Sequence, residues 1–109
     1  MNDDRFSDPL HISWAQEVKV RASFTCEICS LRGVYLESHH MNSYDVYVSE
    51  RYSVMNGVCL CKRCHERFHN MFGYGNNTKF QFKQYQQMVD IFKKILSSDN
   101  PPNFLSEES

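Results

Sequence analysis

The sequence predicts a small α+β domain that needs more than a hydrophobic core to fold. The chain has 109 residues, which is near the lower limit for a self-sufficient core. Residues 78–96 place apolar side chains at helical spacing, whereas Cys59 alternates with Val58 and Leu60 as in a short buried strand. Four of the five cysteines occur as two C-x-x-C pairs, which is the spacing of a metal-binding knuckle. Together these observations favour a metal-stabilised α+β domain.

The N-terminal segment is expected to contain one helix. Residues 1–12 are expected to form an irregular arm, in which His11 stands alone and has no predicted role. Ser13 is expected to cap a short helix that ends at about Ser23 and buries Trp14.

The cysteines form two pairs with the same two-residue gap. The first pair is Cys26 and Cys29, and the second is Cys61 and Cys64. Four thiolates are soft ligands that close a tetrahedral shell around Zn²⁺, so the two pairs predict one structural zinc site. The alternative grouping is a C₂H₂ finger that uses His65. The number of residues between Cys29 and His65 is, however, far larger than the roughly 12 of that motif.

A second set of candidate ligands follows the first cysteine pair. His39 and His40 are adjacent, and Asn56 comes next, followed by His65 and His69 four residues apart. With these residues in this order, the segment from the first cysteine to the last histidine resembles the HNH endonucleases, which are ββα-metal nucleases. The stretch 72–82 is similar to free-standing phage-type members of that family, including homing endonucleases, which implies a phage or mobile-element source.

The resemblance implies a fold as well as an activity. In the family a strand carries the histidine pair, a loop follows, and a second strand leads to a short helix. These elements are expected at Val34–His40, Met41–Val54, Val58–Leu60 and Cys64–Phe72. The core motif is then expected over residues 26–72, within a nuclease domain that spans residues 13–96.

The resemblance also implies a role for each candidate residue. Because neighbouring side chains on a strand point to opposite faces, His39 is expected to bind a metal ion and His40 to act as general base. His65 and His69 are expected to complete the metal site, and Asn56 to brace the loop and so orient His40. A surface position for His69 and a simple Asn-Gly turn at Asn56 are the competing interpretations.

The implied metal site differs from much of the family, which has Asp where this chain has His39. An imidazole-rich site is softer than a carboxylate one, so Mn²⁺, Co²⁺, Ni²⁺ or Zn²⁺ is expected to suit it better than Mg²⁺. Three basic residues near this site, Lys62, Arg63 and Arg67, are candidates for DNA contacts, although exposed basic side chains on a helix are often only solvated.

The C-terminal segment predicts a helix and a tail. The helix is expected over about residues 78–96, facing the core through apolar residues at helical spacing: Phe82, Tyr85, Met88, Val89, Phe92, Ile95 and Leu96. Residues 97–109 are expected to form a flexible acidic tail with a net charge of −3.

Charge and hydropathy limit the classes of partner and location. The whole chain has a net charge of −1, but residues 14–96 carry +4, which is compatible with phosphate binding. No apolar run approaches the roughly 20 residues of a membrane span, and the first residues show no signal segment. An odd number of cysteines favours zinc-bound thiolates in a reducing cytoplasm, here that of a bacterial host cell, over secreted disulfides.

The predicted function is metal-dependent hydrolysis of DNA phosphodiester bonds, leaving 5′-phosphate and 3′-hydroxyl ends as the family resemblance implies. So short a chain offers little surface for recognising a long site, so a homodimer or a phage protein partner is expected to supply specificity. The alternative is a non-catalytic zinc module that binds nucleic acid or a protein. One tight zinc and no second metal would favour that alternative.

Overall fold

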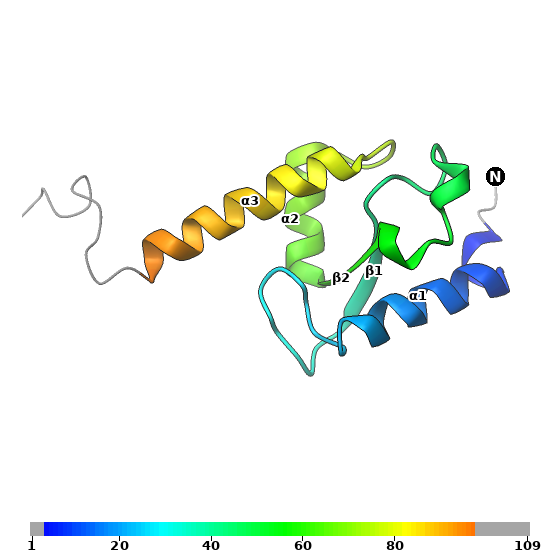
Figure 1. The fold of residues 1–109 in the computed structure, drawn as a ribbon, viewed down its shortest axis with the longest axis horizontal. Coiled ribbons are helices and arrows are strands. Elements are labelled where there is room, and N and C mark those ends of the chain that lie inside the picture. The colour runs from blue at the N-terminus through cyan, green and yellow to red at the C-terminus, as the bar shows by residue number, and fades with distance from the viewer. Residues whose placement is uncertain (1–3, 98–109) are drawn as a thin grey trace, which may run out of the picture.

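The computed structural model describes residues 4–97 and shows a two-stranded sheet with three helices (Figure 1). In chain order the elements are α1 (Pro9–Arg21), β1 (Leu36–His40), β2 (Gly57–Cys61), α2 (Lys62–Phe72) and α3 (Lys79–Leu96). Short 3₁₀ turns occur at Asp4–Ser7, Val48–Glu50 and Val54–Asn56. This arrangement confirms the predicted α+β class. Among the described residues, no helix is both long and apolar enough to cross a bilayer.

The two strands and α2 form a continuous ββα unit. The strands are antiparallel, with Leu36 opposite Cys61 at one end and His40 opposite Gly57 at the other. The first strand is shorter than predicted, because it begins only where β2 offers a pairing partner. The second strand is one residue longer at each end, and α2 begins at Lys62 rather than Cys64, directly after β2.

The first helix begins earlier than predicted. Asp8 is the N-cap, and its side chain accepts a hydrogen bond from the Leu10 amide at 3.0 Å. Pro9 follows at the first helical position, where its missing N–H costs nothing. The prediction that Ser13 caps this helix is therefore wrong, and His11 lies inside the helix and is buried rather than alone in an arm.

The helix also ends slightly before the predicted Ser23. Ser23 and Phe24 have φ values of 54° and 51°, outside the helical region. The chain therefore leaves α1 at Arg21 and turns into the loop that carries the first cysteine pair.

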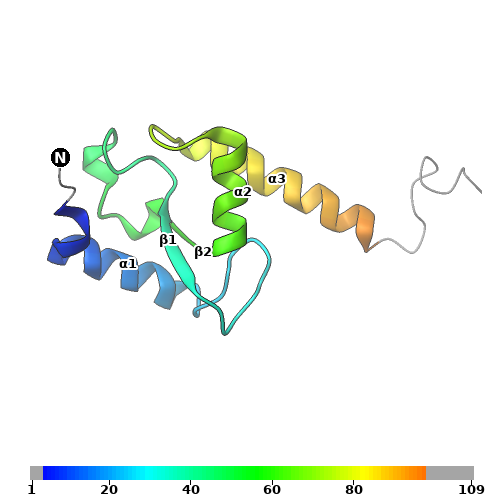
Figure 2. The ribbon, with the colours of Figure 1, turned by 180° about the vertical axis from the view of Figure 1, so that it is seen from behind.

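The core lies between α1, the hairpin and α2. Every residue of β2 is buried, which shows that the strand is covered on both faces. Trp14 and Val18 of α1 pack onto it, with Gly57 as the point of closest approach. Figure 2 shows α1 and α2 on different sides of the hairpin.

The last helix begins where it was predicted to but is only partly packed. Thr78 is its N-cap, and a capping box joins Thr78 to Gln81. Phe82 and Tyr85 are buried in the core, as expected. The predicted core positions Phe92 and Leu96 are instead exposed, in the part of α3 that extends beyond α2 and the hairpin (Figure 1). Apart from Ser97, the predicted flexible tail lies outside the described residues.

Candidate active site

The four paired cysteines gather at the end of the hairpin where β1 begins. Cys26 and Cys29 come from the loop after α1, Cys61 ends β2, and Cys64 lies in the first turn of α2. Their sulfur atoms all lie within 4.8 Å of one another. This confirms the predicted grouping. The fifth cysteine, Cys59, is fully buried in β2 and is not part of this cluster.

The cysteine cluster fits a tetrahedral metal ion. Zinc–sulfur bonds of about 2.3 Å place the ligands of a tetrahedron about 3.8 Å apart, and the Cys29 and Cys61 sulfurs are 3.7 Å apart. Burial raises the pKa of Cys29 and Cys64. Burial acts the same way on Cys26, but hydrogen bonds from backbone amides, first that of Cys29, lower its pKa to about 7. Four thiolates at such spacing need a cation to neutralise their charge.

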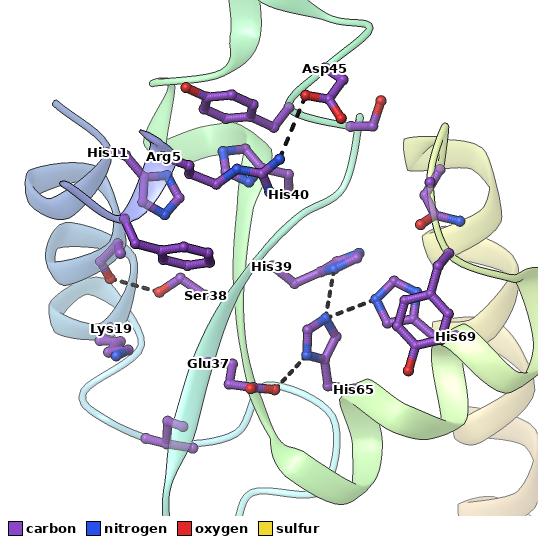
Figure 3. A pocket seen from close by; sticks show the side chains of 18 of the residues that line it. Arg5, His11, Lys19, Glu37, Ser38, His39, His40, Asp45, His65 and His69 are labelled. Atoms are coloured by element: carbon purple, nitrogen blue, oxygen red, sulfur yellow. Dashed lines mark hydrogen bonds and ion pairs between the residues drawn. The ribbon is translucent and has the colours of Figure 1, made fainter. Parts of the chain in front are cut away.

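Three histidines form a second cluster, on one face of β1 and the facing side of α2. The Nδ1 atom of His39 lies 3.2 Å from Nε2 of His65, which lies 3.0 Å from Nε2 of His69 (Figure 3). Metal–nitrogen bonds of about 2.1 Å place neighbouring ligand atoms about 3.0–3.4 Å apart in octahedral or tetrahedral geometry. The spacing of the three nitrogens therefore suits one metal ion.

The outer nitrogens of the two α2 histidines have acceptors of their own. The Nδ1 atom of His65 donates to a carboxylate oxygen of Glu37 at 2.5 Å, and that of His69 donates to the Gly73 carbonyl at 3.0 Å. A neutral imidazole with a proton on Nδ1 presents a lone pair at Nε2. Both lone pairs thus point to the place where His39 also presents a ring nitrogen.

The protonation of this cluster favours a bound cation. Burial, followed by the proximity of His65 and His69, lowers the pKa of His39 well below its usual value. Burial also lowers the pKa of His69. Neutral imidazoles are the form that binds metals, so this donor set fits a divalent ion.

His40 lies on the opposite face of β1 and has different surroundings. Its ring stacks on Trp14, with centroids 3.7 Å apart and an interplanar angle of 11°. Its Nε2 atom donates to the Arg51 carbonyl at 2.8 Å, which leaves Nδ1 as the acceptor. Burial is the main cause that lowers the pKa of His40 to about 4, and the hydrogen bond to Arg51 opposes this shift. The ring is therefore neutral at pH 7.

Asn56 joins the two ends of the loop that carries Arg51. Its side-chain oxygen accepts from the Asn42 amide at 2.9 Å, and its Nδ2 atom donates to the Asn42 carbonyl at 2.9 Å. A longer bond of 3.4 Å reaches the Glu50 carbonyl, next to Arg51. Asn56 is 2% exposed, so these bonds are shielded from water. The side chain holds the segment against which His40 is oriented.

Two residues beside the histidines were not singled out from the sequence. Glu37 lies two residues before His39 on the same strand, so period-two alternation places both on one face. That spacing was a signal that could have identified Glu37. His11 stacks near His40, with ring centroids 5.6 Å apart. No local pattern indicates this contact, because the two residues are brought together only by the packing of α1 on the hairpin.

Comparison with known families identifies the segment that carries both clusters. Residues 26–71 match the model of the HNH endonuclease family. This segment, rather than the whole chain, is similar to the HNH endonucleases. No curated protein and no solved structure matches the chain.

The HNH segment and α1 border one cavity of about 620 Å³. His39, His40, His65 and His69 all line it. Its basic lining residues are Arg5 and Lys19, from the turn before α1 and from α1 itself. The three predicted DNA contacts do not line this cavity; Lys62, Arg63 and Arg67 lie exposed on α2.

Proposed function

We propose that the chain is a metal-dependent DNA endonuclease that hydrolyses phosphodiester bonds and leaves 5′-phosphate and 3′-hydroxyl ends. The separation of two adjacent histidines is the observation that best supports this activity. His39 belongs to a three-nitrogen cluster, whereas His40 lies on the other face of the strand with its own hydrogen bond and stacking partner. Both line one cavity. A purely structural zinc module requires neither arrangement.

His40 is the proposed general base. Its Nε2–H is held by the Arg51 carbonyl, so Nδ1 is the atom that accepts a proton. As the oxygen of a water molecule attacks phosphorus, its proton moves to Nδ1. The bond between phosphorus and the 3′-oxygen then breaks, and the leaving oxygen takes a proton from solvent. Asn56 acts as a positioning residue, because it braces the loop that carries the Arg51 carbonyl.

His39, His65 and His69 are the proposed ligands of the catalytic metal. When bound, a divalent ion neutralises the phosphate and stabilises the leaving oxygen. The three imidazoles favour Mn²⁺, Co²⁺, Ni²⁺ or Zn²⁺ over Mg²⁺. Glu37 and the Gly73 carbonyl keep the ligand nitrogens of α2 aimed at one place before any metal arrives.

The cysteine cluster is proposed to hold a structural Zn²⁺ with no open position for catalysis. We further propose that the protein acts in the cytoplasm of a bacterial host and has a phage or mobile-element source. A homodimer or a phage protein partner would extend the short DNA-binding surface. Exposed Lys62, Arg63 and Arg67 on α2 are proposed to contact DNA phosphates outside the cavity.

A plasmid assay tests the proposed activity and its base together. Wild type is expected to nick or linearise supercoiled plasmid with at least one metal of a panel of Mn²⁺, Co²⁺, Ni²⁺, Zn²⁺ and Mg²⁺. His40→Ala is expected to reduce the rate by about 10²- to 10⁴-fold, the usual effect of losing a general base. Its zinc content and circular dichroism spectrum, measured on the same sample, are expected to match those of wild type.

Three results would count against parts of this proposal. Retained cleavage by His40→Ala contradicts the base assignment, and cleavage with Mg²⁺ alone contradicts the metal preference. One tightly bound metal per chain, with no second site and no cleavage, would favour the non-catalytic zinc module.

A further inference from the structure

Three exposed aromatic side chains border the cavity that contains the histidines. Phe6, Tyr35 and Tyr74 line it and are 76%, 68% and 77% exposed. The core aromatics Phe68 and Phe82 are instead almost completely buried. Single exposed apolar residues are common on protein surfaces, but three that surround one functional cavity suggest a partner with flat apolar faces.

Tyr74 is fixed in place beside the proposed metal ligands. One face of its ring stacks on His69, with centroids 4.1 Å apart and an interplanar angle of 13°. The loop that presents it contains Gly73 and Gly75 at φ values of 80° and 85°, a conformation that favours glycine. Asn77 is buried and donates to the Gly73 carbonyl, which also accepts from His69. The outer face of a held ring is thus open for stacking.

The other two aromatic residues lie toward opposite ends of β1. Tyr35 immediately precedes the strand, at the end where the cysteine cluster lies. Phe6 contacts His11 edge-on at 5.6 Å, and His11 stacks near His40, the last residue of the strand. Five extended residues span about 17 Å. The aromatic rings therefore border a path along the histidine pair rather than a single point.

The cavity has too little net positive charge for a surface that binds duplex DNA. Arg5 and Lys19 line it together with two acidic residues, Glu37 and Asp45, and Arg5 lies 3.6 Å from Asp45. Affinity for duplex DNA comes mainly from many phosphate contacts. Proteins that bind single strands instead combine a few basic groups with aromatic rings on which bases stack.

We propose that this cavity binds an unpaired DNA strand, with bases stacked on Phe6, Tyr35 and Tyr74 and the backbone passing His39 and His40. This inference rests on the proposed endonuclease activity, because the bound strand is the one that is cut. Duplex DNA is then a substrate where its strands have separated, as in supercoiled plasmid, rather than in a regular relaxed helix.

Binding by the cleavage-deficient His40→Ala protein tests the inference without added divalent metal. The probe is a fluorescent oligonucleotide offered as a single strand, as a full duplex, and as a duplex with an unpaired internal stretch, with affinity read by anisotropy. The single strand and the interrupted duplex are expected to bind more tightly than the full duplex. Each added Phe6→Ala or Tyr35→Ala change is expected to weaken single-strand binding about 5- to 100-fold.

Matched variants separate stacking from general surface effects. Phe92→Ala removes a ring that is 58% exposed on α3, outside the cavity, and is expected to leave binding unchanged. Tyr74→Phe keeps the ring and is expected to bind like its parent, whereas Tyr74→Ala is expected to bind weakly. Equal affinity for single strand and full duplex, or aromatic variants that behave like Phe92→Ala, would overturn the inference.

Wild-type plasmid cleavage, measured in parallel, separates this inference from the proposed function. Cleavage without a strand preference shows that the stacking inference alone is wrong. A strand preference without cleavage, across all metals tested, contradicts the endonuclease proposal and leaves the binding site supported.

Discussion

Three histidine rings at the cavity are each oriented by a group that accepts a hydrogen bond from one of their two ring nitrogens. Glu37 sets the direction of His65, the Gly73 carbonyl that of His69, and the Arg51 carbonyl that of His40. Each of these acceptors takes up one N–H and leaves the other nitrogen with a lone pair. The chemistry proposed for the histidines therefore depends on residues that are neither ligands nor bases.

The contact between Glu37 and His65 predicts a measurable effect on metal affinity. Glu37→Gln keeps the shape of the side chain but removes the charge that makes His65 a better ligand. Co²⁺ binding to zinc-loaded protein, followed by calorimetry, is expected to weaken about 10- to 100-fold, the usual effect of such a change. The zinc content of the cysteine cluster is expected to stay the same.

Glu17→Gln provides the control for this substitution. Glu17 lies on α1 and accepts a hydrogen bond from Ser13, away from the histidine cluster. Its variant is expected to bind Co²⁺ like wild type. Unchanged Co²⁺ affinity in Glu37→Gln would mean that Glu37 does not tune the metal site.

At the scale of elements, the direct passage from β2 into α2 links the two clusters. Cys61 ends the strand and is the N-cap of the helix, Cys64 lies in the first turn, and His65 follows at once. His69 comes one turn later on the same face. The cysteine cluster thus sets where α2 starts, and the start of α2 sets where two of the three histidines lie.

The contact of α1 with β2 predicts a stability effect at Gly57. A Cβ atom there would lie 2.3 Å from Cγ2 of Val18 and 2.8 Å from the ring of Trp14. Gly57→Ala is therefore expected to lower the free energy of unfolding by about 1–3 kcal/mol, as overpacking of a core does. Urea denaturation of the zinc-loaded protein measures the change.

A double variant tests whether the clash is the cause. Val18→Ala alone removes buried methyl groups and is also expected to destabilise the protein. Combined with Gly57→Ala it makes room for the new Cβ atom. The free energy of unfolding of the double variant is therefore expected to fall by less than the sum of the two single losses. Strict additivity would show that Val18 is not the obstacle.

At the scale of the whole molecule, a small core is supplemented by the cysteine cluster. The cluster joins the loop after α1 to the end of the hairpin and to the first turn of α2. Structural zinc in small domains supplies free energy on the scale of folding itself. The stability of the described fold is therefore expected to depend on metal.

Removal of one zinc ligand tests this dependence. Cys26→Ser is expected to lose the structural zinc, measured by elemental analysis, and to lose helical circular dichroism and the cooperative unfolding transition. Cys59→Ala removes a buried cysteine outside the cluster and is expected to keep both zinc and fold. A folded, zinc-free Cys26→Ser protein would show that the hydrophobic core suffices.

Sequence reasoning succeeded where spacing alone determines the structure. The cysteine pairs, the ββα order and the start of the last helix depend on residues close together in the chain or on a fixed ligand count. It failed at the start of α1, where Asp8 and Ser13 are both good caps and the following Pro9 decides between them. It missed the contact of His11 with His40, because that contact arises from tertiary packing. The catalytic roles of the histidines stay predictions.

The stacking of Trp14 on His40 has a practical consequence. The sequence contains a single tryptophan, and its indole lies 3.7 Å from the imidazole proposed to act as base. Selectively excited tryptophan emission therefore originates beside His40, which lines the cavity. Any ligand that displaces His40 or changes the polarity around it is expected to alter the emission of Trp14. Ligand binding at His40 can therefore be followed by tryptophan fluorescence without a label.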